Sequence, residues 1–442
     1  MSSRRDFLKS VAPMAMLQLG RALPTLSSIR GNVPSNTAGY SPAEWRSHFP
    51  VLNQSVNGVP LAYLDTAATS QRPTAVVDAI VDFYRRDNAN PGRTLHSLAR
   101  RADQDYEGAR AIVAKFINAT DPLEIVFTRG TTEGVNLVAT AWGSENLKQG
   151  DEVLLTISEH ASSMLPWQLA AKRAGATVRY LDIDDEGNLR LDHLDQLLTS
   201  RTKIVAFMHV SNVLGKINPA KEICARAHRA GAMVMIDAAQ SAPHFRIDVQ
   251  ELGCDFLAFS GHKMMGPMGI GVLWGRRELL DAMPPYQAGS NMAHEVGIES
   301  ADYSAGALKF GAGTPNVSGP VGLAAAIRFI DSIGREQILA HEQELCRYTL
   351  EKFRSVPGLR VLGPQTPRDR IAVFSFVIDG IAPQQIVEAA DAKGIALRAG
   401  DLASLPLLER LGVKRAARAS MYLYTTTEEV DRLVSVLTNL PR

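Results

Sequence analysis

The sequence predicts an α/β protein, in which a large, mostly parallel sheet covered by helices is followed by a smaller α+β domain. Between about residues 61 and 274, short apolar segments alternate with amphipathic ones, a pattern typical of strands joined by helical crossovers. From about residue 321, long helical segments replace this alternation. The composition, 45% hydrophobic and 21% charged over 442 residues, suits two or three domains with large cores.

The first thirty residues are predicted to be an export signal rather than part of the fold. Residues 3–9 read SRRDFLK, a twin-arginine motif, and the apolar stretch 11–19 is too short to span a bilayer. We therefore expect the twin-arginine export machinery to carry the chain, already folded, to the periplasm or the medium. The predicted organisation is a signal peptide (1–30), an N-terminal arm (31–65), a large domain (66–320) and a small domain (321–442).

Strands and helices follow from the periodicity of apolar residues. Short apolar runs bounded by turn residues predict strands at 61–63, 124–127, 152–156, 177–181, 204–209, 234–236, 256–259 and 271–274. Amphipathic segments predict helices at 73–85, 103–118, 133–142, 165–174, 191–197 and 219–230. In the C-terminal part we expect helices at 321–329, 336–356 and 428–440 and a strand at 371–377.

Charge and cysteine usage give no support to several classes of function. The net charge is +1, so the whole-chain balance indicates neither a nucleic acid nor an acidic membrane as partner. Cys224, Cys254 and Cys346 lie far apart and show no CxxC spacing, which argues against a disulfide framework and a zinc site. We expect no metal.

The most informative residues are Lys263 and Asp237. Lys263 follows the predicted strand 256–259 within the small-residue turn SGHK, and Asp237 directly follows the predicted strand 234–236. Pyridoxal 5'-phosphate enzymes need a lysine amine for the Schiff base and a carboxylate that keeps the pyridine nitrogen protonated. Either residue alone is a weak signal. The two in this order, at the ends of consecutive buried strands, predict a site for this cofactor.

A second cluster predicts the place of the cofactor phosphate. Thr131 and Thr132 lie where a strand passes into a helix, and backbone N–H groups at a helix start, with adjacent hydroxyls, suit an anion. Taken alone, this segment is equally well explained as a helix cap. Ser260 and His262, which flank the turn before Lys263, are expected to add phosphate contacts.

Three further polar residues are expected around the cofactor ring. His160 follows a strand and would stack on the ring, although a lone histidine there is more often structural. Gln240, three residues after Asp237, would hydrogen-bond the ring oxygen. Asn212, in the loop after strand 204–209, would face the substrate or the same oxygen.

Two arginines in the small domain are candidates for binding a substrate carboxylate. Arg398 and Arg418 have apolar neighbours, and a guanidinium fork matches a carboxylate. A structural ion pair remains the alternative for each.

Taken together, these segments resemble class V, fold type I pyridoxal-phosphate enzymes, and most closely the cysteine desulfurase and selenocysteine lyase branch. The resemblance runs from about residue 45 to the C-terminus, through YLDTAA (63–68), RGTTEG (129–134), EH (159–160), HVSNVLG (209–215), DAAQ (237–240), FSGHK (259–263), GTPN (313–316) and RAS (418–420).

The resemblance implies a seven-stranded, mostly parallel sheet and assigns roles to individual residues. Lys263 would be the Schiff-base lysine and His160 the stacking ring, while Thr132, Ser260 and His262 would hold the phosphate. Arg398, with Arg418, would bind the substrate carboxylate. It also implies a homodimer, in which Thr314 and Arg93 reach the partner subunit's site.

One departure from the family affects the predicted chemistry. The desulfurases carry a nucleophilic cysteine on the loop after the position of Arg398, and here residues 398–404 read RAGDLAS, with Ala403 in the nucleophile's place. Accepting sulfur as a persulfide requires a nucleophilic sulfur. We therefore expect C–S or C–Se lyase or transaminase chemistry on an amino acid or derivative. The alternatives are a cysteine desulfurase or selenocysteine lyase, tailoring of a secreted siderophore-like peptide, and a cofactor-binding scaffold without activity.

Overall fold

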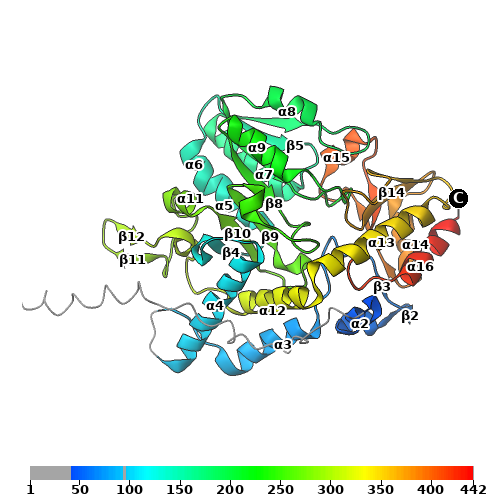
Figure 1. The fold of residues 1–442 in the computed structure, drawn as a ribbon, viewed down its shortest axis with the longest axis horizontal. Helices are drawn as coiled ribbons and strands as arrows, with labels where there is room; N and C mark the ends of the chain where they lie inside the picture. The colour runs from blue at the N-terminus through cyan, green and yellow to red at the C-terminus, as the bar shows by residue number, and fades with distance from the viewer. Residues whose placement is uncertain (1–40, 93–95, 442) are drawn as a thin grey trace, which may run out of the picture.

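A seven-stranded sheet forms the centre of the larger part of the molecule (Figure 1). The computed structural model describes residues 41–92 and 96–441. The strand order is β4-β10-β9-β8-β7-β5-β6. The strands are β4 (Ile125–Thr128), β5 (Glu152–Thr156), β6 (Thr177–Leu181), β7 (Thr202–Met208), β8 (Met233–Asp237), β9 (Phe256–Ser260) and β10 (Gly271–Gly275).

Six of these strands run in the same direction, and β10 runs against both of its neighbours. The β5–β6, β5–β7, β7–β8 and β8–β9 pairs are parallel, whereas β10 is antiparallel to β4 and to β9. The carboxyl ends of β4, β9, β8, β7 and β5 therefore meet at one edge of the sheet. In open α/β sheets, ligands bind outside this edge.

Each face of the sheet is buried in its own hydrophobic core. Successive residues of a strand point to opposite faces, so Val205 and Phe207 of β7 belong to one core and Ile204 and Ala206 to the other. Burial on both faces explains why these strands are continuously apolar. The covering helices are α3 (Thr74–Asp82), α4 (Ser97–Phe116), α9 (Ala220–Arg229) and α12 (Ser318–Ile333) on the first face, and α5 (Thr131–Leu137) and α7 (Ala161–Ala174) on the second.

A second, four-stranded sheet lies beside the large one in the C-terminal part of the chain (Figure 1). Its antiparallel strands, in spatial order, are β13 (Leu359–Val361), β14 (Val373–Ile378), β17 (Ala416–Ser420) and β16 (Arg398–Gly400). The helices that pack on it are α13 (Arg335–Phe353), α14 (Pro383–Asp391) and α16 (Thr427–Thr438). The buried leucines of α15 (Leu405–Arg410) belong instead to the core on the first face of the large sheet.

Short elements complete the described structure. The two-stranded units are β1–β2 (Ser55–Val56, Val59–Pro60), β3–β15 (Ala62–Tyr63, Ile395–Ala396) and the projecting hairpin β11–β12 (Ala293–Val296, Ala301–Tyr303). The remaining helices are α2 (Pro42–Ser47), α6 (Gly143–Asn146), α8 (Leu191–Leu197), α10 (Val249–Leu252) and α11 (Arg277–Ala282). No helix within 41–92 and 96–441 combines the length and apolar character needed to cross a bilayer.

The predicted fold class is confirmed, and one predicted strand is misplaced. The segment 61–63 is not part of the alternating βα pattern, because β3 pairs in parallel with β15 and so joins the C-terminal part. The sequence of a two-residue strand does not indicate which strand it pairs with, and here the partner strand lies more than 300 positions away.

Several helices begin earlier than their apolar periodicity predicts. The predicted helix 103–118 starts at Ser97, where the His96 Nδ1 accepts the Ala99 N–H at 3.2 Å. The predicted helix 165–174 starts at Ala161, capped by His160 Nδ1, which accepts the Ser162 N–H at 3.0 Å. Histidine is an unusual cap, so sequence preferences do not indicate these starts.

Candidate active site

A cavity of about 450 Å³ opens at the carboxyl edge of the large sheet. Its wall is built from both parts of the molecule, because residues following β4, β5, β7, β8 and β9 face residues of β16, β17 and the loop after β16. Of the predicted site residues, it brings together Thr131, Thr132, His160, Asn212, Asp237, Gln240, Ser260, His262, Lys263, Arg398 and Arg418.

Strand order fixes the sequence of groups along the cavity. Thr131 follows β4, Lys263 follows β9, Asp237 ends β8, and His160 follows β5. In the sheet, the order of these strands is β4, β9, β8, β5, with β10 and β7 interposed. Hydroxyl groups therefore lie at one end, followed by the amine, then the carboxylate, then the imidazole.

Lys263 and Asp237 form the charged centre of the cavity. Loss of solvation lowers the pKa of the Lys263 amine to about 8, with the positive charge of Arg418 acting in the same direction and Asp237 opposing it. Burial raises the pKa of the Asp237 carboxyl. Two effects oppose this rise: the carboxyl accepts the Ala239 N–H at 2.9 Å, and the positive charge of Lys263 lies nearby. An amine with a pKa near 8 is available for proton transfer at neutral pH.

The turn carrying Lys263 is held by close backbone packing. A Cβ at Gly261 would lie 2.8 Å from the Ile270 side chain and 3.1 Å from its carbonyl oxygen, so only glycine fits this approach. Gly261 N–H donates to that carbonyl oxygen at 2.9 Å. The 3-10 turn Gly261–Lys263 is thereby fixed against the start of β10.

The hydroxyl end of the cavity joins two segments that are distant in sequence. Ser260 Oγ accepts the Thr131 N–H at 2.8 Å and lies 2.7 Å from Thr131 Oγ1, while Thr132 Oγ1 donates to Ser162 Oγ at 2.8 Å. Gly130 has φ +155, which few side-chain-bearing residues adopt. The hydroxyl groups of this cluster, at the start of α5, suit an anion.

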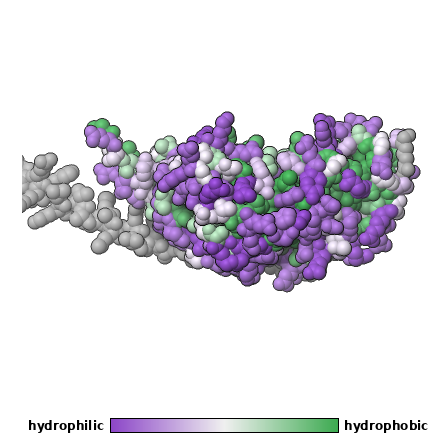
Figure 2. Space-filling model, turned by 90° about the horizontal axis from the view of Figure 1, so that it is seen from above, coloured by the Kyte–Doolittle hydropathy of each residue, from purple (hydrophilic) through white to green (hydrophobic). Residues whose placement is uncertain are grey.

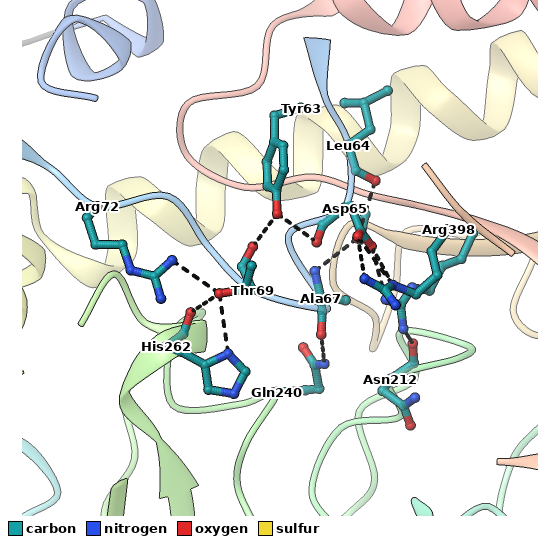
Figure 3. Close-up of polar contacts among 12 residues, drawn as sticks. Tyr63, Leu64, Asp65, Ala67, Thr69, Arg72, Asn212, Gln240, His262 and Arg398 are labelled. Atoms are coloured by element: carbon teal, nitrogen blue, oxygen red, sulfur yellow. Dashed lines mark hydrogen bonds and ion pairs between the residues drawn. The ribbon is translucent and has the colours of Figure 1, made fainter. Parts of the chain in front are cut away.

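Two histidines on the wall are neutral at neutral pH. Burial, together with the charges of Lys263 and Arg418, lowers the pKa of His160 to about 4. Burial and the charge of Lys263 likewise lower the pKa of His262 to about 4. The His262 Nδ1 lies 3.3 Å from Thr69 Oγ1, so this ring also contacts the segment after β3 (Figure 3).

The side chains of Gln240 and Asn212 bind protein groups that the sequence did not predict. Gln240 Nε2 donates to the Ala67 carbonyl at 2.8 Å. Asn212 Nδ2 donates to the Leu402 carbonyl at 2.9 Å, and its Oδ1 accepts from Ser404 Oγ at 3.3 Å. Both line the cavity, but Asn212 principally holds the loop after β16.

Arg398 and Arg418 share one carboxylate, that of Asp65, which sequence reasoning did not single out. Figure 3 shows Asp65 beside Arg398. Arg398 approaches it with Nε at 3.1 Å and Nη2 at 2.9 Å, and the Arg418 Nη2 lies 3.3 Å away. The predicted structural ion pair is thus present for both arginines, which also face the cavity. The only sequence signal for Asp65 was its place in YLDTAA.

The loop after β16 presents Ala403 to the cavity in a fixed conformation. The Ala403 carbonyl accepts the Ala161 N–H at 2.8 Å, and Asp401 Oδ1 accepts the Ala403 N–H at 3.1 Å. Leu402 and Ala403 have φ of 52° and 54°, a region that residues other than glycine rarely adopt. These hydrogen bonds hold the strained loop against the start of α7.

The expectation that Thr314 and Arg93 reach a partner subunit's site stays a prediction. Thr314 is exposed and does not line this cavity. Arg93 lies outside the described residues.

Comparisons with known proteins agree with this arrangement. The family described as "Aminotransferase class-V" matches residues 62–433. The chain belongs to the class V aminotransferase family. A probable cysteine desulfurase from Halalkalibacterium halodurans is 48% identical over 394 residues, which cover 89% of this chain and 96% of that protein.

Two solved structures of cysteine desulfurases share the class V fold seen here. The apo enzyme from Thermococcus onnurineus NA1 has a TM-score of 0.86, and CsdA from Escherichia coli, in an S-sulfonic acid form, has a TM-score of 0.83. Each is 38% identical and covers 90% of this chain and 97% of its own. The chain is therefore a cysteine desulfurase-like, pyridoxal-phosphate-dependent enzyme, and these relatives favour the desulfurase alternative over the lyase or transaminase expectation.

The donors around the cavity fit pyridoxal phosphate. Pyridoxal phosphate needs a carboxylate at its ring nitrogen, an amine at its aldehyde and hydrogen-bond donors at its phosphate. The cavity offers Asp237, Lys263 and the Thr131–Ser260 hydroxyl cluster for these three positions, in the order that the strands impose. A positive charge on the ring nitrogen would lower the pKa of Asp237, offsetting the effect of burial.

Proposed function

We propose that this protein removes sulfur or selenium from a cysteine-like amino acid and passes it to a thiol that the chain itself does not supply. The observation that carries the proposal is the shared cavity, in which Lys263 and Asp237 face Arg398 and Arg418 across the two parts of the molecule. The relatives named above support the substrate class.

Each group has a defined task in this chemistry. When bound, pyridoxal phosphate supplies an electron sink for negative charge at the substrate Cα. The Lys263 amine, with its pKa near 8, accepts the Cα proton and can return it. Arg398 and Arg418 hold the substrate carboxylate. The neutral His160 covers one wall without adding charge.

The proposed thiol comes from solution because none of the chain's cysteines is positioned to accept sulfur. Cys224, Cys254 and Cys346 are buried and do not line the cavity. Burial raises the pKa of the Cys224 and Cys346 thiols to about 12, and it raises the pKa of the Cys254 thiol well above its usual value. A buried, protonated thiol is a poor nucleophile.

The products distinguish the competing reactions. Desulfuration converts L-cysteine and a thiol into L-alanine and a persulfide, as the C–S bond breaks and an S–S bond forms. Elimination converts L-cysteine and water into pyruvate, ammonia and sulfide. The absence of a thiol among the cavity residues favours elimination as the second candidate.

The first test measures these products with the cofactor-loaded protein and L-cysteine, with and without added dithiothreitol. We expect the amount of alanine to increase when dithiothreitol is added, and to stay in proportion to the amount of sulfide released. Pyruvate that is independent of the thiol would replace the proposal with a lyase, and a keto acid retaining the substrate's sulfur would replace it with a transaminase.

Restoring a cysteine on the loop gives a sharper test. We expect Ala403→Cys to form alanine without added thiol, in a burst of about one equivalent per site, because its Sγ would accept sulfur at the cavity wall. The matched control is Ala403→Ser, which adds a side-chain oxygen in place of sulfur and should show no burst. The persulfide on residue 403 would be detected by mass spectrometry after alkylation. Equal behaviour of the two variants would contradict the proposed place of sulfur transfer.

We also propose that the chain is exported through the twin-arginine route, on the strength of residues 3–9. These residues lie outside the described structure. Replacing Arg4 and Arg5 with lysine should leave the protein in the cytoplasm of a producing bacterium, as measured by fractionation. An unchanged distribution would contradict the proposal.

A homodimer is proposed as the working state. The surface in the view of Figure 2 is mostly hydrophilic. The projecting β11–β12 hairpin nevertheless carries Val296, which is 75% exposed, and Ile298, which is fully exposed. Exposed branched apolar side chains favour an interaction surface. Light scattering should give twice the chain mass, and Ile298→Asp should shift the equilibrium toward the monomer if this hairpin contributes.

A further inference from the structure

Glu159 is a buried acid that directly precedes His160 of the cavity wall. The residue is 1% exposed and does not itself line the cavity. Its Oε1 accepts the Thr156 hydroxyl at 2.6 Å and the Met208 N–H at 3.1 Å. Thr156 ends β5, and Met208, which lines the cavity, ends β7. Glu159 therefore connects the carboxyl ends of two neighbouring strands from behind the wall.

This connection lies where the pairing of β5 with β7 has already stopped. The register between the two strands runs only to Leu154 and Val205, before the end of either strand. Beyond that point the Glu159 carboxyl accepts the Met208 N–H. On the other side, Met208 is the register partner of Asp237 in β8. A displacement of Met208 would therefore be passed to Asp237.

The surroundings of the Glu159 carboxyl favour its neutral, protonated form. Oε1 meets a hydroxyl and an N–H, and the buried Oε2 has no partner at hydrogen-bonding geometry within 41–92 and 96–441. Burying a charge without a cation beside it is costly. Burial raises the pKa of Glu159 to about 8, and the charge of Asp237 acts in the same direction. The donors Thr156, Met208 and Ser163 oppose this rise, but burial outweighs them.

We propose that Glu159 is a positioning residue for the cofactor, which holds the end of β7, and through it Asp237, by means of a neutral carboxyl group. The neutral form matters because a second negative charge beside Asp237 would disfavour the ionised carboxylate that the ring nitrogen requires. Residues behind a site that lock its members in place are needed for exact geometry. The inference concerns the cofactor alone, so it holds whichever substrate reaction follows.

The test titrates pyridoxal phosphate into cofactor-free protein at pH 7 without substrate, and records affinity and cofactor absorbance. Glu159→Gln keeps a neutral oxygen acceptor for Thr156 and Met208, so its affinity should stay within about twofold of the wild type, with the same absorbance. Glu159→Ala leaves the Met208 N–H buried without an acceptor, so its affinity should fall by about tenfold or more and the absorbance should shift. An infrared difference spectrum between the wild type and Glu159→Gln should show the carbonyl band of a neutral carboxyl group.

The matched control is Glu342, another fully buried acid. Its Oε1 lies 2.6 Å from His244 Nδ1, and its Oε2 also has no hydrogen-bond partner among the described residues. Neither Glu342 nor His244 lines the cavity. Glu342→Ala should lower the melting temperature of the cofactor-free protein and leave the cofactor absorbance unchanged.

Several results would overturn the inference. A loss of affinity in Glu159→Gln as large as in Glu159→Ala, or carboxylate bands in the infrared difference, would show that Glu159 is charged. Unchanged cofactor binding in Glu159→Ala would show that it positions nothing, and an equal absorbance shift in Glu342→Ala would show a purely structural effect. If Glu159→Ala does not fold, Glu159→Gln decides alone, and a shifted cofactor absorbance in that variant would contradict the proposal.

Discussion

At the scale of single residues, the structure places a titratable amine beside a buried acid. Lys263 and Asp237 were predicted from their positions after two strands, and the cavity brings them together. Their pKa shifts have opposite directions for the same physical reason, because burial disfavours the charged form of each. That effect depends on packing and has no signature in sequence.

The pKa of Lys263 predicts how cofactor attachment depends on pH. Only the neutral amine can bond to the aldehyde, so borohydride-trapped cofactor should increase as pH rises through about 8. Lys263→Ala should abolish trapping and lower turnover by about 100-fold or more. Lys309, whose amine donates to backbone carbonyls such as that of Leu280 at 3.1 Å, provides the control Lys309→Ala. Cofactor that is still trapped by borohydride in Lys263→Ala would disprove the assignment of Lys263 as the Schiff-base lysine.

At the scale of elements, the loop after β7 joins the two sheets. Gly215, with φ +67, accepts the Ile371 N–H at 2.9 Å through its carbonyl. Its neighbour Val213 accepts from the Ser375 hydroxyl of β14 at 2.6 Å. The segment HVSNVLG was recognised in the sequence as part of the site, but its contacts with β14 depend on how the two parts pack.

Gly215→Ala should destabilise the protein more than the same substitution at another glycine with a positive φ. A Cβ there would lie 2.8 Å from the carbonyl oxygens of Ile371 and Val373, so we expect a loss of about 2–4 kcal/mol in the free energy of unfolding. Gly231 has φ +81 and open space around its Cβ, and Gly231→Ala should cost only about 1 kcal/mol. Denaturant unfolding of both variants measures the difference, and equal losses would contradict the packing argument.

At the scale of the whole molecule, several buried histidines make stability sensitive to acid. Burial lowers the pKa of His160, His209 and His262 from 6.5 to about 4. Between these values the unfolded chain binds protons that the folded chain does not, so stability falls as pH decreases from 6.5 to 4. Glu159, whose pKa burial raises to about 8, acts in the opposite direction between pH 8 and 4.5.

Burial also raises the pKa of the Asp105, Asp237, Glu342 and Glu429 carboxyls, which oppose the histidines as Glu159 does. The prediction therefore concerns a single histidine: by itself, His209 should make the melting temperature of the cofactor-free protein fall between pH 6.5 and 4. His209 is the cleanest probe, because it is buried and its Nδ1 has no hydrogen-bond partner within the described part of the chain. His209→Asn should flatten this dependence, and His193→Asn, on the exposed helix α8, should not. An identical pH profile for all three proteins would disprove the assignment of the acid sensitivity to His209.

The sequence by itself determined the alternation of strands and helices, the order of Thr131, His160, Asp237 and Lys263 along the chain, and the absence of a cysteine at position 403. These follow from local patterns, since apolar runs and turn residues act within a few positions. Only the tertiary structure decided that β3 joins β15, that Asn212 holds the 402–404 loop, and that Asp65 pairs with both arginines. Asp65 and Arg398 are 333 positions apart, and no local preference reports a charge interaction that forms only when the two parts pack.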